Sequence, residues 1–307
     1  MLRKNEKRDK IMAMHVLENE FLKVFVADAG AELSSVMDKE SGLERLHDGN
    51  PEIWNRHAPI LFPFVGRVVG GKYRVDGKEY EMKTQHGFAR DREFECVEAD
   101  TNHVVHRLLP NDDTRKIYPY EFELLVTHEL DQENPRLLNV KWEVKNNGDH
   151  KMRYFIGGHP AFTTVEAETK AKEEYYLEFV GCDSIKYFGV SSETAFATPD
   201  EHKTVALDNG FLKFNEDVLI TMIFDNYAFD KVRICRPDKT PYVTMECSQF
   251  TSFGIWAKEN GNFICLEPWA GRTDNDGFSG TIDEKIGVNT LEAGESKKIC
   301  HSIEFHK

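Results

Sequence analysis

The segment Phe155-Ile156-Gly157-Gly158-His159-Pro160-Ala161-Phe162 organises the rest of the chain. It follows a strand-like run, residues 137–144, and a polar turn, so a β-strand leads into its two glycines. Pro160 has a fixed φ angle and biases the histidine before it to an extended backbone. An imidazole held on a stiff turn between apolar residues is a candidate for proton transfer near neutral pH. The alternative is a histidine that only ends a strand.

A second stretch, ICLEPWAGR at residues 264–272, repeats this design with a carboxylate. An apolar strand leads to Glu267, and Pro268 follows as the expected end of the strand. Two turns that each present one ionisable residue before a proline favour a shared site over two unrelated strand ends.

Outward from these two stretches, the sequence consists of short apolar runs separated by Gly, Asn and Asp turns, such as Gly70-Gly71 and Asp76-Gly77. No segment shows a sustained helical period, although the charged residues 169–176 could form a helix or a loop. The pattern predicts an all-β sandwich or barrel over residues 14–307 as a single domain, with residues 1–13 as a disordered extension and 197–209 as a surface excursion. The expected strands are 22–26, 33–37, 59–65, 72–75, 79–82, 93–98, 103–109, 122–130, 137–144, 152–156, 175–180, 218–224, 232–235, 242–246, 253–257, 263–266 and 296–305.

Composition and net charge limit the kinds of molecule that the protein is expected to bind. The chain has 307 residues and a net charge of −14, which argues against nucleic acid or an anionic membrane surface as partner. No apolar stretch approaches the roughly 20 residues that a membrane helix requires. The N-terminus lacks the apolar segment of a signal peptide, and the six cysteines are scattered without C-x-x-C pairs. We therefore expect a cytoplasmic protein with reduced cysteines that needs no metal or other cofactor.

Four motifs place an ionisable residue at the edge of an apolar or glycine-rich segment: APILFPFVGR with Arg67, QHGFAR with His86, GGHPAF with His159, and ICLEPWAGRTD with Glu267. In this order, they resemble the motifs of the aldose 1-epimerase (galactose mutarotase) superfamily, and most closely those of its bacterial LacX-like branch. The resemblance extends from Met14 to the C-terminus. Any one motif is weak, but four in order over about two hundred residues are specific.

The resemblance implies a large antiparallel β-supersandwich around a sugar-binding cleft. It implies that Glu267 is the general base that takes the proton from the anomeric hydroxyl of the sugar. His159 would then be the general acid that protonates the ring oxygen as the ring opens. His86 and Arg67 would hydrogen-bond the substrate and polarise the reacting oxygens. Each such proton-transfer group typically contributes about 10²–10⁴-fold to the rate.

The family also grips sugar hydroxyls with an aspartate, for which Asp217 is the candidate and Asp225 the second choice. Pro268-Trp269 stands where galactose-specific members tend to carry a glutamine, which leaves the sugar open. Sugar sites use aromatic faces, so Trp269, Trp256 and Phe88 are candidate walls, with core packing as the alternative for each.

Three functions remain open: an aldose 1-epimerase for free hexoses, a hexose-6-phosphate 1-epimerase, or a non-catalytic carbohydrate sensor. A phosphorylated substrate would need a cationic grip, and Arg90 lies four residues after His86. Arg90, Arg92 and Arg272 could otherwise be surface charges. A metal-dependent enzyme would need clustered ligands, and a glycoside hydrolase would need two facing carboxylates. The partner is therefore expected to be a small sugar, bound by a monomer or homodimer.

The remaining histidines are interpreted as surface or structural residues: His57, His103, His106, His128, His150, His202, His301 and His306.

Overall fold

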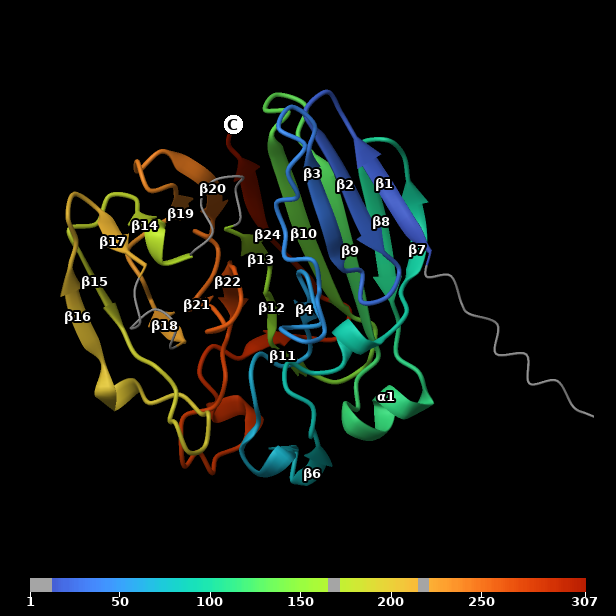
Figure 1. Ribbon diagram of the computed structural model, residues 1–307. Helices are drawn as coiled ribbons and strands as arrows, with labels where there is room; N and C mark the ends of the chain where they lie inside the picture. Colours follow the sequence, from blue (N-terminus) through green and yellow to red (C-terminus); the bar gives the residue numbers. More distant parts are fainter. Residues whose placement is uncertain (1–12, 165–171, 215–220) are drawn as a thin grey trace, which may run out of the picture.

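A computed structural model describes residues 13–164, 172–214 and 221–307. Its largest element is a 9-stranded antiparallel sheet in the order β17-β14-β19-β20-β24-β10-β9-β8-β7 (Figure 1). In that order, its strands are β17 Phe211–Lys213, β14 Tyr176–Phe179, β19 Lys231–Cys235, β20 Pro241–Glu246, β24 Ser296–Phe305, β10 Leu137–Asn146, β9 Phe122–Leu130, β8 His103–Leu108 and β7 Glu95–Ala99.

A second sheet runs β18-β21-β22-β12-β4, and β13 also pairs with β22. Its strands are β18 Met222–Asp225, β21 Ser252–Trp256, β22 Phe263–Ala270, β12 Ile156–Gly158, β4 Ile60–Leu61 and β13 Ala161–Thr163. The N-terminal sheet contains β1 Met14–Glu18, β2 Leu22–Ala27 and β3 Leu33–Asp38. Three two-stranded ribbons complete the β-structure: β5 Lys72–Val75 with β6 Lys78–Glu81, β11 Met152–Tyr154 with β23 Asn289–Leu291, and β15 Ser184–Tyr187 with β16 Lys203–Ala206.

The helical elements are short. They are α1 Asp112–Ile117 and the 3₁₀ turns η1 Val69–Gly71, η2 Ala89–Asp91, η3 Lys172–Glu174, η4 Pro199–Glu201 and η5 Ile282–Glu284. The sequence analysis did not predict α1, because six residues are too few for a helical period. Its start is marked instead by a capping box, in which the Asn111 side chain accepts the backbone N–H groups of Asp113 and Thr114. No helix in the described part of the chain is long and apolar enough to cross a membrane.

The sheets pack in layers around a large apolar core, and Ala161, Phe263 and Cys265 form a second, small cluster. In Figure 1, β1 to β3 lie across β8 and β9, and β1 contacts both of these strands. Strand β9 shows why the layers form: its alternate side chains from Phe122 to Leu130 are buried, and the residues between them are partly exposed. The same alternation recurs along β10 and β24. The predicted all-β sandwich is therefore confirmed.

The prediction that Pro268 ends its strand is wrong, because β22 continues to Ala270. One edge of β22 pairs with β21 from Cys265 to Trp269, but the other edge has two partners. Strand β13 pairs with Phe263 to Cys265, and β12 pairs with Trp269 and Ala270. Pro268 lies in the interval between these partners, where its missing N–H leaves no ladder hydrogen bond unmade.

Other predicted segments differ in part. Only Ile60 and Leu61 of the expected strand 59–65 are assigned to a strand. The expected excursion at 197–209 is anchored by buried Ala197, and Lys203–Ala206 pairs with β15. Residues 1–12, 169–171 and 218–220 of the predicted segments lie outside the described residues, while Lys172–Glu174 forms η3.

Three histidines are buried on the inner face of the large sheet: His106 on β8, His128 on β9 and His301 on β24. Burial lowers the pKa of His128 and of His301 to about 3, and it also lowers that of His106. Each ring therefore stays neutral in the folded protein at pH values where an unfolded chain would protonate it.

This burial predicts a loss of stability in acid. Because the folded pKa of His128 is about 3 and its ordinary value is 6.5, the unfolded state binds the proton first. The stabilisation is complete above about pH 6.5 and is lost progressively as the pH falls toward 3. We expect His128→Leu to reduce the loss of unfolding free energy between pH 7 and pH 4, measured by urea denaturation at both pH values. His150→Gln is the matched control, since the His150 side chain is 84% exposed. If His128→Leu lost as much unfolding free energy between pH 7 and pH 4 as the unmodified protein, this account would be contradicted.

Candidate active site

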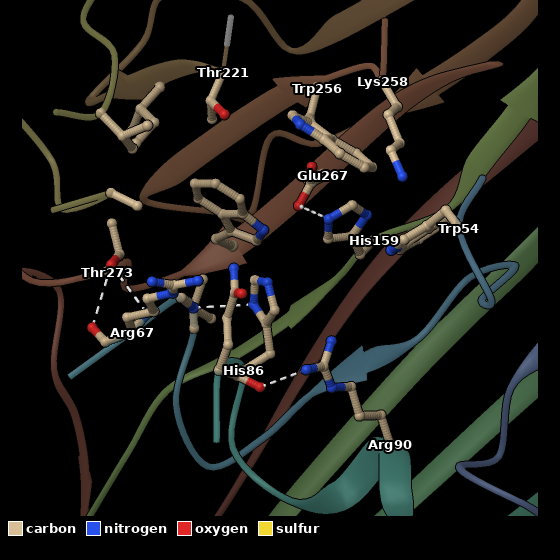
Figure 2. Close-up of a pocket in the computed structure, with 17 residues that line it drawn as sticks. Trp54, Arg67, His86, Arg90, His159, Thr221, Trp256, Lys258, Glu267 and Thr273 are labelled. Atoms are coloured by element: carbon tan, nitrogen blue, oxygen red, sulfur yellow. Dashed lines mark hydrogen bonds and ion pairs between the residues drawn. The ribbon is translucent and has the colours of Figure 1, made fainter. Parts of the chain in front are cut away.

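The pair predicted to carry chemistry lies in a cavity of about 320 Å³ (Figure 2). Such a volume falls in the range of small-molecule sites. The cavity is lined by Trp54, Val65, Gly66, Arg67, Gln85, His86, Arg90, His159, Val190, Ala195, Thr221, Ile223, Trp256, Lys258, Glu267, Trp269 and Thr273.

His159 and Glu267 meet where the partner of β22 changes. His159 and Pro160 connect β12 to β13, opposite the interval of β22 that contains Glu267. The His159 Nε2 atom lies 3.2 Å from the Glu267 Oε2 atom, and Figure 2 shows the two side chains pointing toward one another. Both residues are buried. Two motifs that are more than a hundred residues apart in sequence thus form one pair.

Burial sets the protonation of this pair. It raises the pKa of the Glu267 carboxyl well above its ordinary 4.5 and lowers the pKa of His159 to about 3. Both shifts disfavour the charged forms. In the free protein near neutral pH, the pair therefore holds one proton, carried by the carboxyl, with a neutral imidazole beside it. The pKa of the carboxyl thus lies above that of the imidazole, whereas the ordinary values, 4.5 and 6.5, have the opposite order.

His86 is held in one tautomer by the segment around Gly66. The backbone N–H of Gly66 donates to the ring atom His86 Nδ1 at 3.0 Å. The backbone N–H of His86 donates in turn to the Gly66 carbonyl at 2.7 Å. The first bond requires a lone pair on Nδ1, so a neutral ring carries its hydrogen on Nε2. Burial lowers the pKa of His86 and keeps the ring neutral. The His86 ring packs edge-on against His159, with centroids 5.5 Å apart.

Gly66 allows a close approach between its own backbone and Thr273. A Cβ atom at Gly66 would lie 2.2 Å from the Thr273 Cβ atom, and its φ of +71° also favours glycine. The Arg67 N–H donates to Thr273 Oγ1 at 3.1 Å, while the Arg67 side chain is exposed and lines the cavity. The close contact therefore fixes the backbone from which Arg67 extends.

Trp269 explains two glycines of the sequence. A Cβ atom at Gly157 would lie 2.6 Å from its ring, and one at Gly254 would lie 2.4 Å from it. The indole is therefore inserted between β12 and β21, with one side open to the cavity. Trp256 also lines the cavity, as predicted. Phe88 does not, because it packs in the core against Phe62 and Phe122.

Trp54 and Lys258 line the cavity without having been predicted. The Trp54 ring lies 4.8 Å from the His159 ring and 5.5 Å from that of Trp256. Lys258 Nζ donates to the carbonyl of Ile53, which holds the Trp54 segment over His159. Neither residue belongs to a motif, so no local sequence signal marked them.

Arg90 extends from η2 into the cavity wall. Its side chain is 17% exposed, and its Nη2 donates to the Gln85 carbonyl at 2.7 Å. This bond supports the loop that carries His86, as Figure 2 shows. Arg90 is therefore not a free surface charge.

The two candidate aspartates differ in what can be said of them. Asp217 lies outside the described residues. Asp225 does not line the cavity; its Oδ2 accepts from Arg272 Nε at 2.8 Å, and its Oδ1 accepts from Ser252. Arg272 is buried and stacks on Phe188, so its interpretation as a surface charge is wrong.

Two groups in the described part of the chain bring three potential metal ligands together, which the sequence spacing did not indicate. One is His159, Cys265 and Glu267, of which His159 and Glu267 line the cavity. Burial raises the pKa of the Cys265 thiol and that of the Glu267 carboxyl, and metal ligation would require both groups to lose their protons. The other group is remote in the fold and is considered below.

Comparison with known proteins identifies the family of this chain. The family model for aldose 1-epimerase matches residues 14–275. The chromosomally encoded protein LacX of Lactococcus lactis is 31% identical over 298 residues, which cover 94% of this chain and 97% of that protein.

Solved structures extend the likeness to the fold. A galactose mutarotase related enzyme from Lactobacillus acidophilus aligns with a TM-score of 0.89 and 30% identity over 96% of this chain and 98% of its own. A galactose mutarotase-like protein from Lactobacillus casei aligns with a TM-score of 0.85 and 30% identity, over 96% of this chain and 100% of its own. The chain belongs to the aldose 1-epimerase family, in its LacX-like branch.

Proposed function

We propose that this protein is an aldose 1-epimerase that interconverts the α and β anomers of a hexose by general acid/base catalysis. The observation that supports it best is the 3.2 Å contact between His159 and Glu267 inside a cavity with three tryptophans. A sugar presents apolar ring faces and many hydroxyls, which suits aromatic walls with a few polar groups.

Ring opening moves two protons. Glu267, as base, takes the proton from the hydroxyl on C1 while the bond between C1 and the ring oxygen breaks. His159, as acid, gives a proton to that ring oxygen. The aldehyde then rotates about the C1–C2 bond and closes on its other face, with both proton transfers reversed. The cycle consumes no proton and changes no oxidation state.

The free pair holds its proton on the opposite group from the one that the assigned roles require. A carboxylic acid beside a neutral imidazole already contains one donor and one acceptor. Moving the proton across the 3.2 Å contact produces the carboxylate and imidazolium that the assigned roles require. His86 offers its Nε2–H to an oxygen of the sugar.

Removal of either proton carrier should abolish most of the turnover. Glu267→Gln keeps the shape but cannot accept the proton, and His159→Asn cannot deliver one. We expect each to lower kcat at least about 100-fold with a modest change in KM, and the double variant to be little worse than the worse single one. Polarimetry or NMR exchange of glucose and galactose anomers measures this.

Exposed Glu292→Gln is the matched control for loss of a carboxylate. Thermal unfolding of each variant establishes that it is folded. A folded Glu267→Gln protein that anomerised its sugar at the wild-type rate would show that Glu267 is not the general base. Sugar binding without turnover in the wild type would favour the carbohydrate sensor instead.

The pH profile should follow the reversed pKa order. Loss of kcat/KM in acid should reflect protonation of His159, whose pKa is about 3, and loss in base should reflect the raised pKa of Glu267. With the ordinary pKa values of the two groups, 4.5 and 6.5, Glu267 would instead set the acidic limb. We expect a plateau through neutral pH, measured between the acid and base limits of folding. A narrow bell between 4.5 and 6.5, the ordinary values, would contradict it.

A second candidate substrate is a hexose 6-phosphate. The observation in its favour is that Arg67, Arg90 and Lys258 line the cavity, against one carboxylate among the described lining residues, Glu267. Arginine and lysine are the usual partners of phosphate.

Two variants separate the substrates. If the sugar is phosphorylated, Arg90→Ala and Lys258→Met should each raise KM for the phosphate about ten- to a hundredfold, since a charge-assisted hydrogen bond contributes about 1.5–3 kcal/mol. KM for the free hexose should change little. Both side chains also donate to backbone carbonyls, so the alternative is a structural role. In that case, each variant should raise KM equally for the phosphate and for the free hexose. That outcome would assign the two cations to loop support.

A further inference from the structure

Two imidazoles and a carboxylate converge between the N-terminal sheet and the large sheet. His15 is on β1, Asp28 follows β2, and His106 is on β8. The Asp28 Oδ1 atom lies 2.8 Å from His15 Nε2 and 3.0 Å from His106 Nε2. The three ligand atoms all lie within 4.8 Å of one another. None of these residues lines the cavity of the candidate active site.

This spacing suits a metal ion. Zinc binds imidazole nitrogen and carboxylate oxygen at about 2.0–2.2 Å, so two ligands of one ion lie roughly 3 Å apart or slightly more. Imidazole and carboxylate together are the ligand types of the first-row transition metals rather than of calcium or magnesium. Two neutral rings and one carboxylate leave a net positive site with room for water ligands.

The surroundings of the rings favour ligation. Cys96 Sγ lies 3.8 Å from His15 Nδ1, which can hold the hydrogen of that ring on Nδ1 and leave the Nε2 lone pair facing Asp28. His106 is completely buried, so its ring is held in place on β8. The side chains of His15 and Asp28 are 25% and 16% exposed, so an ion has a path from solvent.

We propose that His15, Asp28 and His106 bind one divalent transition-metal ion, best matched by Zn²⁺, which fastens β1 to the large sheet. The role is structural and independent of the proposed epimerase reaction. An ion at this position would link three segments that are far apart in sequence, and a site absent from the unfolded chain converts binding energy into folding energy.

The test titrates metal-free full-length protein with Zn²⁺ by calorimetry and follows Tm with and without the ion. We expect one equivalent to bind and Tm to rise. Asp28→Asn and the partly exposed His15→Gln should each weaken the affinity at least about tenfold and remove the rise in Tm, without lowering epimerase activity. These two variants keep the test decisive should a substitution at buried His106 fail to fold.

Glu267→Gln is the matched control, because His159, Cys265 and Glu267 form the other possible ligand group. It should retain the affinity and the rise in Tm. Loss of Zn²⁺ binding in Glu267→Gln but not in Asp28→Asn would place the ion in the cavity and overturn the proposal. Absence of stoichiometric binding would also overturn it, leaving Asp28 as the acceptor of two imidazole N–H bonds. With Co²⁺ as probe, a thiolate charge-transfer band would show that Cys96 binds the metal and would contradict the proposed ligand set.

Discussion

The interrupted pairing of one strand determines the geometry of the candidate site. Strand β22 is paired along one edge by β21, but its other edge passes from β13 to β12. The connection between those two strands contains His159 and Pro160, and the facing interval of β22 contains Glu267 and Pro268. Two prolines, which cannot donate to a ladder, lie where no ladder is formed. The break thus brings two ionisable side chains within 3.2 Å inside a sheet.

Burial then gives the pair its properties. A carboxyl and an imidazole in water would each carry charge in part of the neutral range, but at this site desolvation suppresses both charges. The surrounding tryptophans contribute to that desolvation, and Gly157 and Gly254 leave the space that Trp269 occupies. The packing that excludes water from the pair also builds the apolar walls that a sugar ring would contact.

Local and overall charge differ in this protein. The chain carries a net charge of −14, yet the described lining residues of the cavity include three cationic side chains and one carboxylate. Net charge constrains large charged partners, whereas a small ligand experiences the side chains within a few ångströms. The cations at the cavity also have structural partners, since Arg90 and Lys258 each bind a backbone carbonyl of a neighbouring loop. Support of the loops and recognition of an anion are compatible roles for these residues.

The sequence by itself determined the all-β class and most strands of the two large sheets, because alternation and turn residues are local signals. It also marked Arg67, His86, His159 and Glu267, each of which lies in a short motif. Only the tertiary structure decided that Trp54 and Lys258 line the cavity, that Phe88 packs in the core, and that Arg272 pairs with Asp225. Those outcomes depend on contacts between segments distant in sequence. For the same reason, only burial in the assembled sheets could reverse the pKa order of His159 and Glu267.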